Sequence, residues 1–377
     1  MKKSNYLLKR IECFKESMGK EGVDALVALS PENVLYSTGA YIMTQKEIRD
    51  RLEIAIFSQK LEPIFIVCNI EESGVKEQTW IKDIRPYVEF KESPVQFLVD
   101  ALIEMGLEKG HIGIEKHYWD VYSYTELINA LPDATFVECQ RIFEDVRRIK
   151  DPDEIEILTK AAEATRKALE ATFLLVKTGD TEFDIANQMK INLLNQGADG
   201  IAFMVLGTGR RSMLVHPTPA DDISISSGDI IKVDFGGVFS QGYLSDFARS
   251  VVVEKSSKIQ VEVYKKLATI QKKIINTMKP GIRCCDLFNK CKKLYEENEL
   301  PLNMPHIGHG LGIGAHEDPI LSPLNEEKLQ KNMVICVEPL VITNGFCIHL
   351  EDLVLITDNG VKILSGAKLG GELPIIG

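Results

Sequence analysis

Hydrophobic residues recur along this chain in two patterns, one typical of buried strands and the other of amphipathic helices. Over residues 1–22, apolar side chains at helical spacing stand among charges, which predicts an amphipathic helix and not a signal peptide. Apolar runs at residues 23–29, 52–57, 63–68 and 112–114 predict strands, and residues 93–105 and 118–131 predict helices. We expect a polar loop over residues 30–41. Such alternation indicates an α/β domain.

A charged segment at residues 146–154, VRRIKDPDE, interrupts this alternation. Pro152 disfavours a helical conformation in the residue before it, and Asp151 or Asp153 can cap a helix that follows. Because 377 residues exceed what one hydrophobic core normally holds, two domains are expected. We place the boundary in this segment, with domains over residues 1–149 and 150–377.

The second domain repeats one order of elements, two helices and then a β-hairpin. Helices are predicted over residues 155–176 and 181–195, ahead of a hairpin with arms at residues 230–239 and 243–254. Helices over residues 259–278 and 283–297 precede a second hairpin over residues 333–356. The order suggests an internal duplication of an ααββ unit, with a site where the two halves meet.

Each predicted hairpin carries an acidic residue on each of its apolar arms. The four acids are Asp234, Asp246, Glu338 and Glu351. Converging carboxylates repel one another by several kcal/mol at low effective dielectric, and divalent cations are the usual counter-charge. For the first pair alone, an ion pair with Arg249 or an exposed hairpin face stays an alternative. Residues 305–319, PHIGHGLGIGAHEDP, offer three histidines, and one neutral imidazole would complete a transition-metal site.

Net charge and cysteine content indicate which partners and which kind of metal site to expect. A net charge of −11 and a pI near 5.3 argue against nucleic acid or an anionic membrane as partner. No apolar run approaches the roughly 18 residues of a membrane span. The eight cysteines are scattered without a CxxC pair, which indicates reduced thiols in a cytoplasmic protein and argues against a cysteine zinc site.

With these residues assembled, the chain resembles the metallopeptidase family of methionine aminopeptidase, aminopeptidase P and prolidase. The matching motifs are a hairpin ending in SD-x-x-R, a GHG-x-G segment followed by HE-x-P, an EP after a strand and an ED in the last hairpin. The resemblance covers the whole length. It implies an α/β (α+β) architecture, with a creatinase-like N-terminal domain followed by a catalytic domain of the pita-bread fold.

The resemblance implies a site for two divalent ions. Its ligands would be Asp234, Asp246, His309, Glu338 and Glu351. Asp246 and Glu351 would bridge the ions, which would lower the pKa of a shared water, and Glu338 would also serve as the proton shuttle. The ions could be Mn, Co, Zn or Fe, and we favour Mn.

The resemblance also implies residues that contact the substrate. His216, in LVHPTP, and His316, in AHEDP, match family histidines at the scissile group, and we expect both to be catalytic. Arg249 and His349 are expected in substrate binding, although Arg249 could instead hold a bridging acid. His349 stands where many proline-specific members carry arginine, and period two places it on the strand face of Glu351. It could change substrate preference or only orient Glu351.

The implied activity is hydrolysis of Xaa-Pro bonds, at the N-terminus of peptides or in dipeptides, by a homodimer acting on a peptide or small amide. Two alternatives stay open. One is a hydrolase of a small non-peptide C–N substrate, as creatinase-like and ectoine-hydrolase-like relatives are. The other is a non-catalytic binding protein on the same fold, which the intact ligand set disfavours. The first hairpin's turn, residues 240–242, is one residue longer than is usual in the family.

Overall fold

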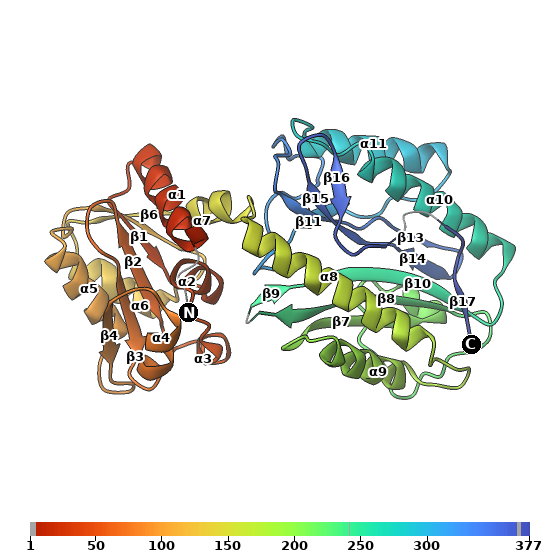
Figure 1. Ribbon diagram of the computed structural model, residues 1–377, viewed down its shortest axis with the longest axis horizontal. Helices are drawn as coiled ribbons and strands as arrows, with labels where there is room; N and C mark the ends of the chain where they lie inside the picture. The colour runs from red at the N-terminus through yellow and green to blue at the C-terminus, as the bar shows by residue number, and fades with distance from the viewer. Residues whose placement is uncertain (1–4, 241, 368–370) are drawn as a thin grey trace. The chain divides into compact units, whose positions relative to one another are not determined.

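The computed structural model describes residues 5–240, 242–367 and 371–377. The chain divides into two compact units, Met1–Arg147 and Arg148–Gly377, which we describe separately (Figure 1). Among the described helices, none combines the length and apolar character that crossing a membrane requires. The predicted turn of the first hairpin includes Gln241, which lies outside the described residues.

A six-stranded sheet with the order β4-β3-β2-β1-β5-β6 forms the centre of the first unit. β2 pairs antiparallel with β1 and β3, and the other pairs are parallel. The strands are Ala25–Ala28 (β1), Ile54–Ser58 (β2), Ile64–Cys68 (β3), Asp83–Tyr87 (β4), His111–Ile114 (β5) and Thr135–Glu138 (β6). The apolar runs predicted the four central strands. They missed the edge strands β4 and β6, because most side chains there are partly exposed.

Helices cover both faces of this sheet (Figure 1). They are Asn5–Glu21 (α1), Pro31–Thr38 (α2), Met43–Glu47 (α3), Glu72–Gln78 (α4), Pro94–Glu104 (α5), Val121–Ala130 (α6) and Gln140–Arg147 (α7). On one face Phe14 of α1 packs against Tyr36 and Phe143, with ring centroids 6.1 and 5.1 Å away. On the other face Leu98 of α5 packs in one cluster with Val27 of β1. The predicted amphipathic N-terminal helix is confirmed.

The polar loop predicted over residues 30–41 is wrong, because most of it forms α2. The Ser30 side chain caps this helix by accepting from the backbone N–H of Asn33 at 3.2 Å, and Pro31 occupies its first turn. The helix buries polar groups: the Asn33 amide donates to the buried carboxylate of Glu115 at 2.7 Å. Polar residues that are buried in this way leave no hydrophobic periodicity in the sequence.

Glu53, directly before β2, is a fully buried acid in the first unit. One of its carboxylate oxygens accepts from the backbone N–H of Cys68 at 3.0 Å, whereas Oε1 has no hydrogen-bond partner among the described residues. Burial raises the pKa of Glu53 to about 9, although the Cys68 N–H opposes the shift. The carboxyl group is therefore protonated in the folded unit at neutral pH.

We expect Glu53→Gln to flatten the pH dependence of the stability of the first unit. The pKa of Glu53 in the folded unit lies above its unfolded value of about 4.3, so the contribution of Glu53 to stability is fully present below the unfolded pKa. It is then lost toward about pH 9, by at most about 1.4 kcal/mol per pH unit. Urea unfolding of the wild type should give a lower free energy of unfolding at about pH 8 than at about pH 6. Equal pH dependence in the variant would contradict this assignment.

The second unit contains two halves, each with helices outside and strands inside (Figure 1). In the first half, α8 (Pro152–Phe173) and α9 (Glu182–Asn195) pack on a sheet of order β17-β10-β8-β7, in which β9 pairs with β8. The strands are Gly200–Thr208 (β7), Ile230–Phe239 (β8), Tyr243–Leu244 (β9), Phe247–Val253 (β10) and Ile375–Ile376 (β17). Asp151 caps α8 by accepting from the backbone N–H of Glu154 at 3.0 Å, and the helix ends at Phe173, earlier than predicted.

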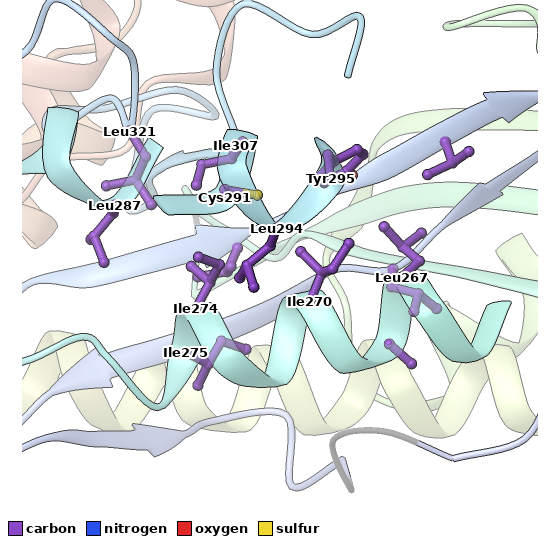
Figure 2. Close-up of a cluster of buried hydrophobic side chains, with 14 of the residues drawn as sticks. Leu267, Ile270, Ile274, Ile275, Leu287, Cys291, Leu294, Tyr295, Ile307 and Leu321 are labelled. Atoms are coloured by element: carbon purple, nitrogen blue, oxygen red, sulfur yellow. The ribbon is translucent and has the colours of Figure 1, made fainter. Parts of the chain in front are cut away.

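In the second half, α10 (Lys258–Ile275) and α11 (Cys284–Glu297) pack on a sheet of order β11-β12-β15-β16. Figure 2 shows Ile270 and Ile274 of α10 beside Leu294 of α11 in this core. The strands are Gly308–Gly310 (β11), Val334–Val337 (β12), Asp352–Ile356 (β15) and Val361–Ile363 (β16), and Leu340–Thr343 (β13) pairs with Phe346–His349 (β14). The predicted order of helices and hairpins is confirmed, and the duplication stays a prediction.

Candidate metal centre

The four predicted acids lie on or between strands of the two hairpins. Asp234 belongs to β8, Asp246 lies between β9 and β10, Glu338 follows β12 and Glu351 precedes β15. Backbone bonds join the hairpins: the N–H of Glu351 donates to the carbonyl of Ala248 at 3.0 Å. Ala248 is also the strand partner of Asp234. These pairings bring acids from both halves together.

Asp246 is positioned by the residue before it. Ser245 is fully buried, and its Oγ accepts from the backbone N–H of Gly237 at 2.9 Å and from Oγ1 of Thr165 on α8 at 2.6 Å. A Cβ atom at Gly236 would lie 1.9 Å from the Ser245 carbonyl oxygen, so only glycine allows this approach. The interruption between β9 and β10 therefore places Asp246 at a fixed point.

The four acids have buried oxygens without a hydrogen-bond partner among the described residues. These atoms are Asp234 Oδ1, Asp246 Oδ1, Glu338 Oε1 and both carboxylate oxygens of Glu351. The adjacent Asp352 is as buried as Glu351, yet it accepts from Arg249, Gln271 and Ser365 at 2.7, 3.1 and 3.0 Å. Burying an unpaired carboxylate is very unfavourable, so the unfilled oxygens of Glu351 fit a bound cation.

Two groups of ligand atoms meet the spacing of a metal site, with all atoms of a group within 4.8 Å of one another. One group is Asp246, His309, Cys336 and Glu351, and the other is Asp234, His349 and Glu351. Glu351 belongs to both groups, which is the arrangement expected of a bridging carboxylate. Carboxylate oxygen and imidazole nitrogen suit Mn, Co, Zn or Fe. The residues present therefore fit two neighbouring divalent ions.

The electrostatics separate Glu338 from the other acids. Burial and then the nearby acids, Glu351 for Asp246 and Asp234 for Glu351, raise the pKa of both Asp246 and Glu351. Burial also opposes ionisation of Glu338, but the imidazoles of His306 and His349, 3.3 and 3.7 Å from its carboxylate oxygens, hold its pKa well below the ordinary value. Glu338 is therefore a carboxylate kept ionised by imidazoles.

His309 directs one ring nitrogen at the acids. Its Nδ1 lies 3.0 Å from the carbonyl oxygen of Gly310, and its Nε2 lies 3.3 Å from Glu338 Oε1 and 3.8 Å from Asp246 Oδ2. The ring stacks on that of His316, with centroids 3.8 Å apart. His316 and His216 are exposed, and burial, His309 and His216 contribute to lowering the pKa of His316. His316 thus lies beside His309 of the centre, and His216 lies close enough to His316 to influence its charge.

Cys336 is a member of the centre that sequence reasoning missed. It pairs with His309 across β11 and β12, and it stands two residues before Glu338. Burial and then the acids Glu351 and Asp246 raise the pKa of its thiol. The spacing of the cysteines does not indicate Cys336 as a ligand, but strand alternation places it on the same face as Glu338. A Cβ atom at Gly308 would lie 2.1 Å from the Cys336 carbonyl oxygen, which explains the glycine before His309.

Among the described residues, Arg249 donates to backbone carbonyls and to Asp352, and not to the carboxylates of the four acids. Its Nη1 donates to the carbonyl of Glu351 and, at 2.9 Å, to that of Ala248. Its Nη2 donates to Asp352 Oδ1 at 2.7 Å, and its guanidinium carbon lies 4.1 Å from the centroid of the Phe247 ring. This geometry favours the positioning role over the predicted role in substrate binding.

Lys232 of β8 holds the loop that carries His216 by two hydrogen bonds. It is 1% exposed, and its Nζ donates to the carbonyl oxygens of Leu214 and Val215 at 2.5 and 2.8 Å. Sequence reasoning did not single out this lysine, because nothing local distinguishes a buried lysine from an exposed one. We infer that its ammonium group fixes the backbone next to His216.

We expect Lys232→Met to lower kcat toward the value of His216→Ala while the ions stay bound. Loss of one group that contacts a developing oxyanion typically lowers kcat by about 10²–10³. Lys232→Arg, which keeps the charge, should lose less. Steady-state kinetics with metal analysis of each variant checks this, and metal loss that parallels the loss of rate would argue against a loop-anchoring role.

Comparison with known proteins finds a family for each of the two units of the chain. Residues 156–358 match metallopeptidase family M24, and residues 10–149 match the Creatinase/Prolidase N-terminal domain. Fold and carboxylate centre together define a metal-dependent hydrolase. The chain belongs to metallopeptidase family M24.

Relatives and solved structures cover nearly the whole chain. It is 29% identical over 367 residues to the Xaa-Pro dipeptidase of Pyrococcus furiosus, across 94% of this chain and 97% of that protein. The Xaa-Pro dipeptidase from Bacillus anthracis has the same fold, with a TM-score of 0.88 at 23% identity over 98% of this chain and all of that one. The prolidase from Pyrococcus horikoshii has a TM-score of 0.84 at 28% identity, over 96% of this chain and 99% of that one. The predicted family and fold class are confirmed.

Proposed function

We propose that this protein is a two-metal hydrolase that cleaves Xaa-Pro bonds, at the N-terminus of peptides or in dipeptides. The observation that carries the proposal is the pair of ligand groups that share Glu351. The proposed ligands are Asp234, Asp246, His309, Glu338 and Glu351. When bound, the ions would supply Lewis-acid chemistry and an activated water. The Xaa-Pro dipeptidase and prolidase relatives support the substrate class.

Residues of the chain would supply proton transfer and hydrogen bonds to the substrate. Glu338 would accept a proton from the attacking water, since its neighbouring imidazoles keep it ionised. His216 and His316 would hydrogen-bond to the scissile group from the exposed side of the centre. Mn²⁺ is the ion we favour. The homodimer, the cytoplasmic location and the domain boundary between residues 149 and 150 stay predictions.

A second candidate is a hydrolase of a small non-peptide C–N substrate on the same scaffold. The observation that favours it is His349, which is 3% exposed and lies 3.9 Å from Asp234 Oδ2 and 3.7 Å from Glu338 Oε2. Arginine at this position would offer a permanent cation and a rigid fork for a substrate carboxylate, whereas imidazole is shorter and offers neither. The pocket can therefore differ in length and charge from that of a standard proline dipeptidase.

The test is hydrolysis by protein stripped with a chelator and reloaded with Mn²⁺. We would measure kcat/KM for Xaa-Pro dipeptides, matched Xaa-Ala dipeptides, Xaa-Pro tripeptides and non-peptide amides, in wild type and His349→Arg. Metal-dependent preference for Xaa-Pro over Xaa-Ala supports the first proposal, and hydrolysis of the amides alone supports the second. If His349→Arg changes all rates together without changing their ranking, His349 does not set specificity.

A further inference from the structure

His349 occupies a position in the centre that a hydrogen-bonded supporting role does not account for. It ends β14, and its backbone N–H donates to Oγ of Ser250 on β10 at 2.9 Å, which fixes its place beside the first hairpin. Its ring is buried between Asp234 and Glu338. Yet Nε2 makes no hydrogen bond within the described part of the chain. A buried imidazole nitrogen without a partner is unfavourable unless something else binds it.

The two groups of ligand atoms show what the His349 imidazole can bind. Each group combines Glu351 with one aspartate, and each contains one imidazole, that of His309 or that of His349. We propose that His349 is a metal ligand, so that each of the two ions receives one imidazole. This inference rests on the proposed two-metal function and adds a ligand to the five that the resemblance implies.

The charge of the centre favours this role for histidine. Four ionised carboxylates balance two divalent ions, and a neutral imidazole adds a donor without disturbing that balance. An arginine in the same place would add a permanent positive charge next to Asp234 and could not donate a lone pair to a cation. Histidine at this position can therefore bind a cation that arginine would repel.

A second imidazole has a consequence for metal choice. Imidazole nitrogen binds Co²⁺ and Zn²⁺ more strongly than Mn²⁺, which follows the general order of divalent affinities. The binding site formed by Asp234 and His349 should therefore prefer Co²⁺ or Zn²⁺ to Mn²⁺. This preference should be stronger in the wild type than in His349→Arg. The expected result is a selectivity ratio at least about 10-fold larger in the wild type, the size typical of changes around a metal.

The decisive measurement counts imidazoles directly. X-ray absorption of protein loaded with two Zn²⁺ ions distinguishes imidazole from oxygen ligands. Wild type should show about one imidazole per ion, and His349→Gln about one-half, because only His309 remains. The matched control is His306→Gln, which removes an imidazole 3.3 Å from Glu338 that belongs to neither ligand group. This control should leave the count unchanged.

Calorimetric titration of the metal-free proteins with Zn²⁺ and Mn²⁺ gives an independent readout. His349→Gln should weaken one of two binding steps by about 10–100-fold and leave the other within about threefold. Unchanged affinities and an unchanged imidazole count in both His349 variants would overturn the inference while two-ion binding by wild type still supports the proposed function. Failure of wild type to bind two ions would overturn both. Circular dichroism of each variant excludes misfolding as the cause of a lost ion.

Discussion

Replacing Glu351 with glutamine is expected to abolish hydrolysis and the binding of both ions, and yet to stabilise the metal-free protein. Glu351 belongs to both ligand groups, so its loss affects two ions at once. We expect kcat/KM to fall by about 10³-fold or more, equivalent to roughly 4 kcal/mol of transition-state stabilisation. Without metal, both oxygens of Glu351 are buried without a hydrogen-bond partner in the described part of the chain. The group is then unfavourable at neutral pH either as an unpaired charge or as a carboxyl that must take up a proton, and a neutral amide avoids both.

The adjacent acid provides the matched control. Asp352→Asn changes the same functional group at the same depth, but Asp352 is already satisfied by Arg249, Gln271 and Ser365. Breaking this buried network should lower the free energy of unfolding by about 3–5 kcal/mol, while two ions still bind. Thermal melts with and without metal therefore separate the variants by the sign of the change. Two tightly bound ions in Glu351→Gln would show that Glu351 does not bridge them.

The sequence predicted the fold well wherever apolar periodicity and helix caps coincide with burial. The central strands of the first unit and the helix that follows the Asp151 cap are examples. The prediction failed where burial involves polar groups. In α2, Asn33 is buried because its amide donates to Glu115, a residue far away in the sequence. Such a pairing exists only after the chain has folded, so no local pattern reveals it.

The same limit applies to the centre. Acids within apolar strands are conspicuous in the sequence, because an unpaired buried charge requires an explanation. The direction of Arg249 and the burial of Lys232 depend instead on which carbonyl groups the folded chain presents, those of Glu351 and Leu214. Strand period placed His349 with Glu351, but its closeness to Asp234 comes from the other hairpin. Contacts across the two halves were therefore the part that sequence alone could not supply.

Glu338→Gln is expected to separate proton transfer from metal binding. Glu338 lies outside both groups of closely spaced ligand atoms, so each ion keeps its other donors. Glutamine retains the shape of the side chain and an oxygen that can face His306, but it cannot accept a proton from water. We expect kcat to fall by about 10²–10⁴, the usual contribution of a general base, while two ions remain bound.

Glu338→Asp is the companion variant, because it keeps the charge and withdraws it from His306 and His309, each 3.3 Å away in the wild type. A shuttle that depends on position should recover only part of the rate in this variant. Kinetics and metal analysis of the same samples give the answer. If the ions are lost in proportion to kcat in Glu338→Gln, Glu338 acts as a ligand alone, and the exposed ring of His316, stacked on His309, becomes the group to test as proton acceptor.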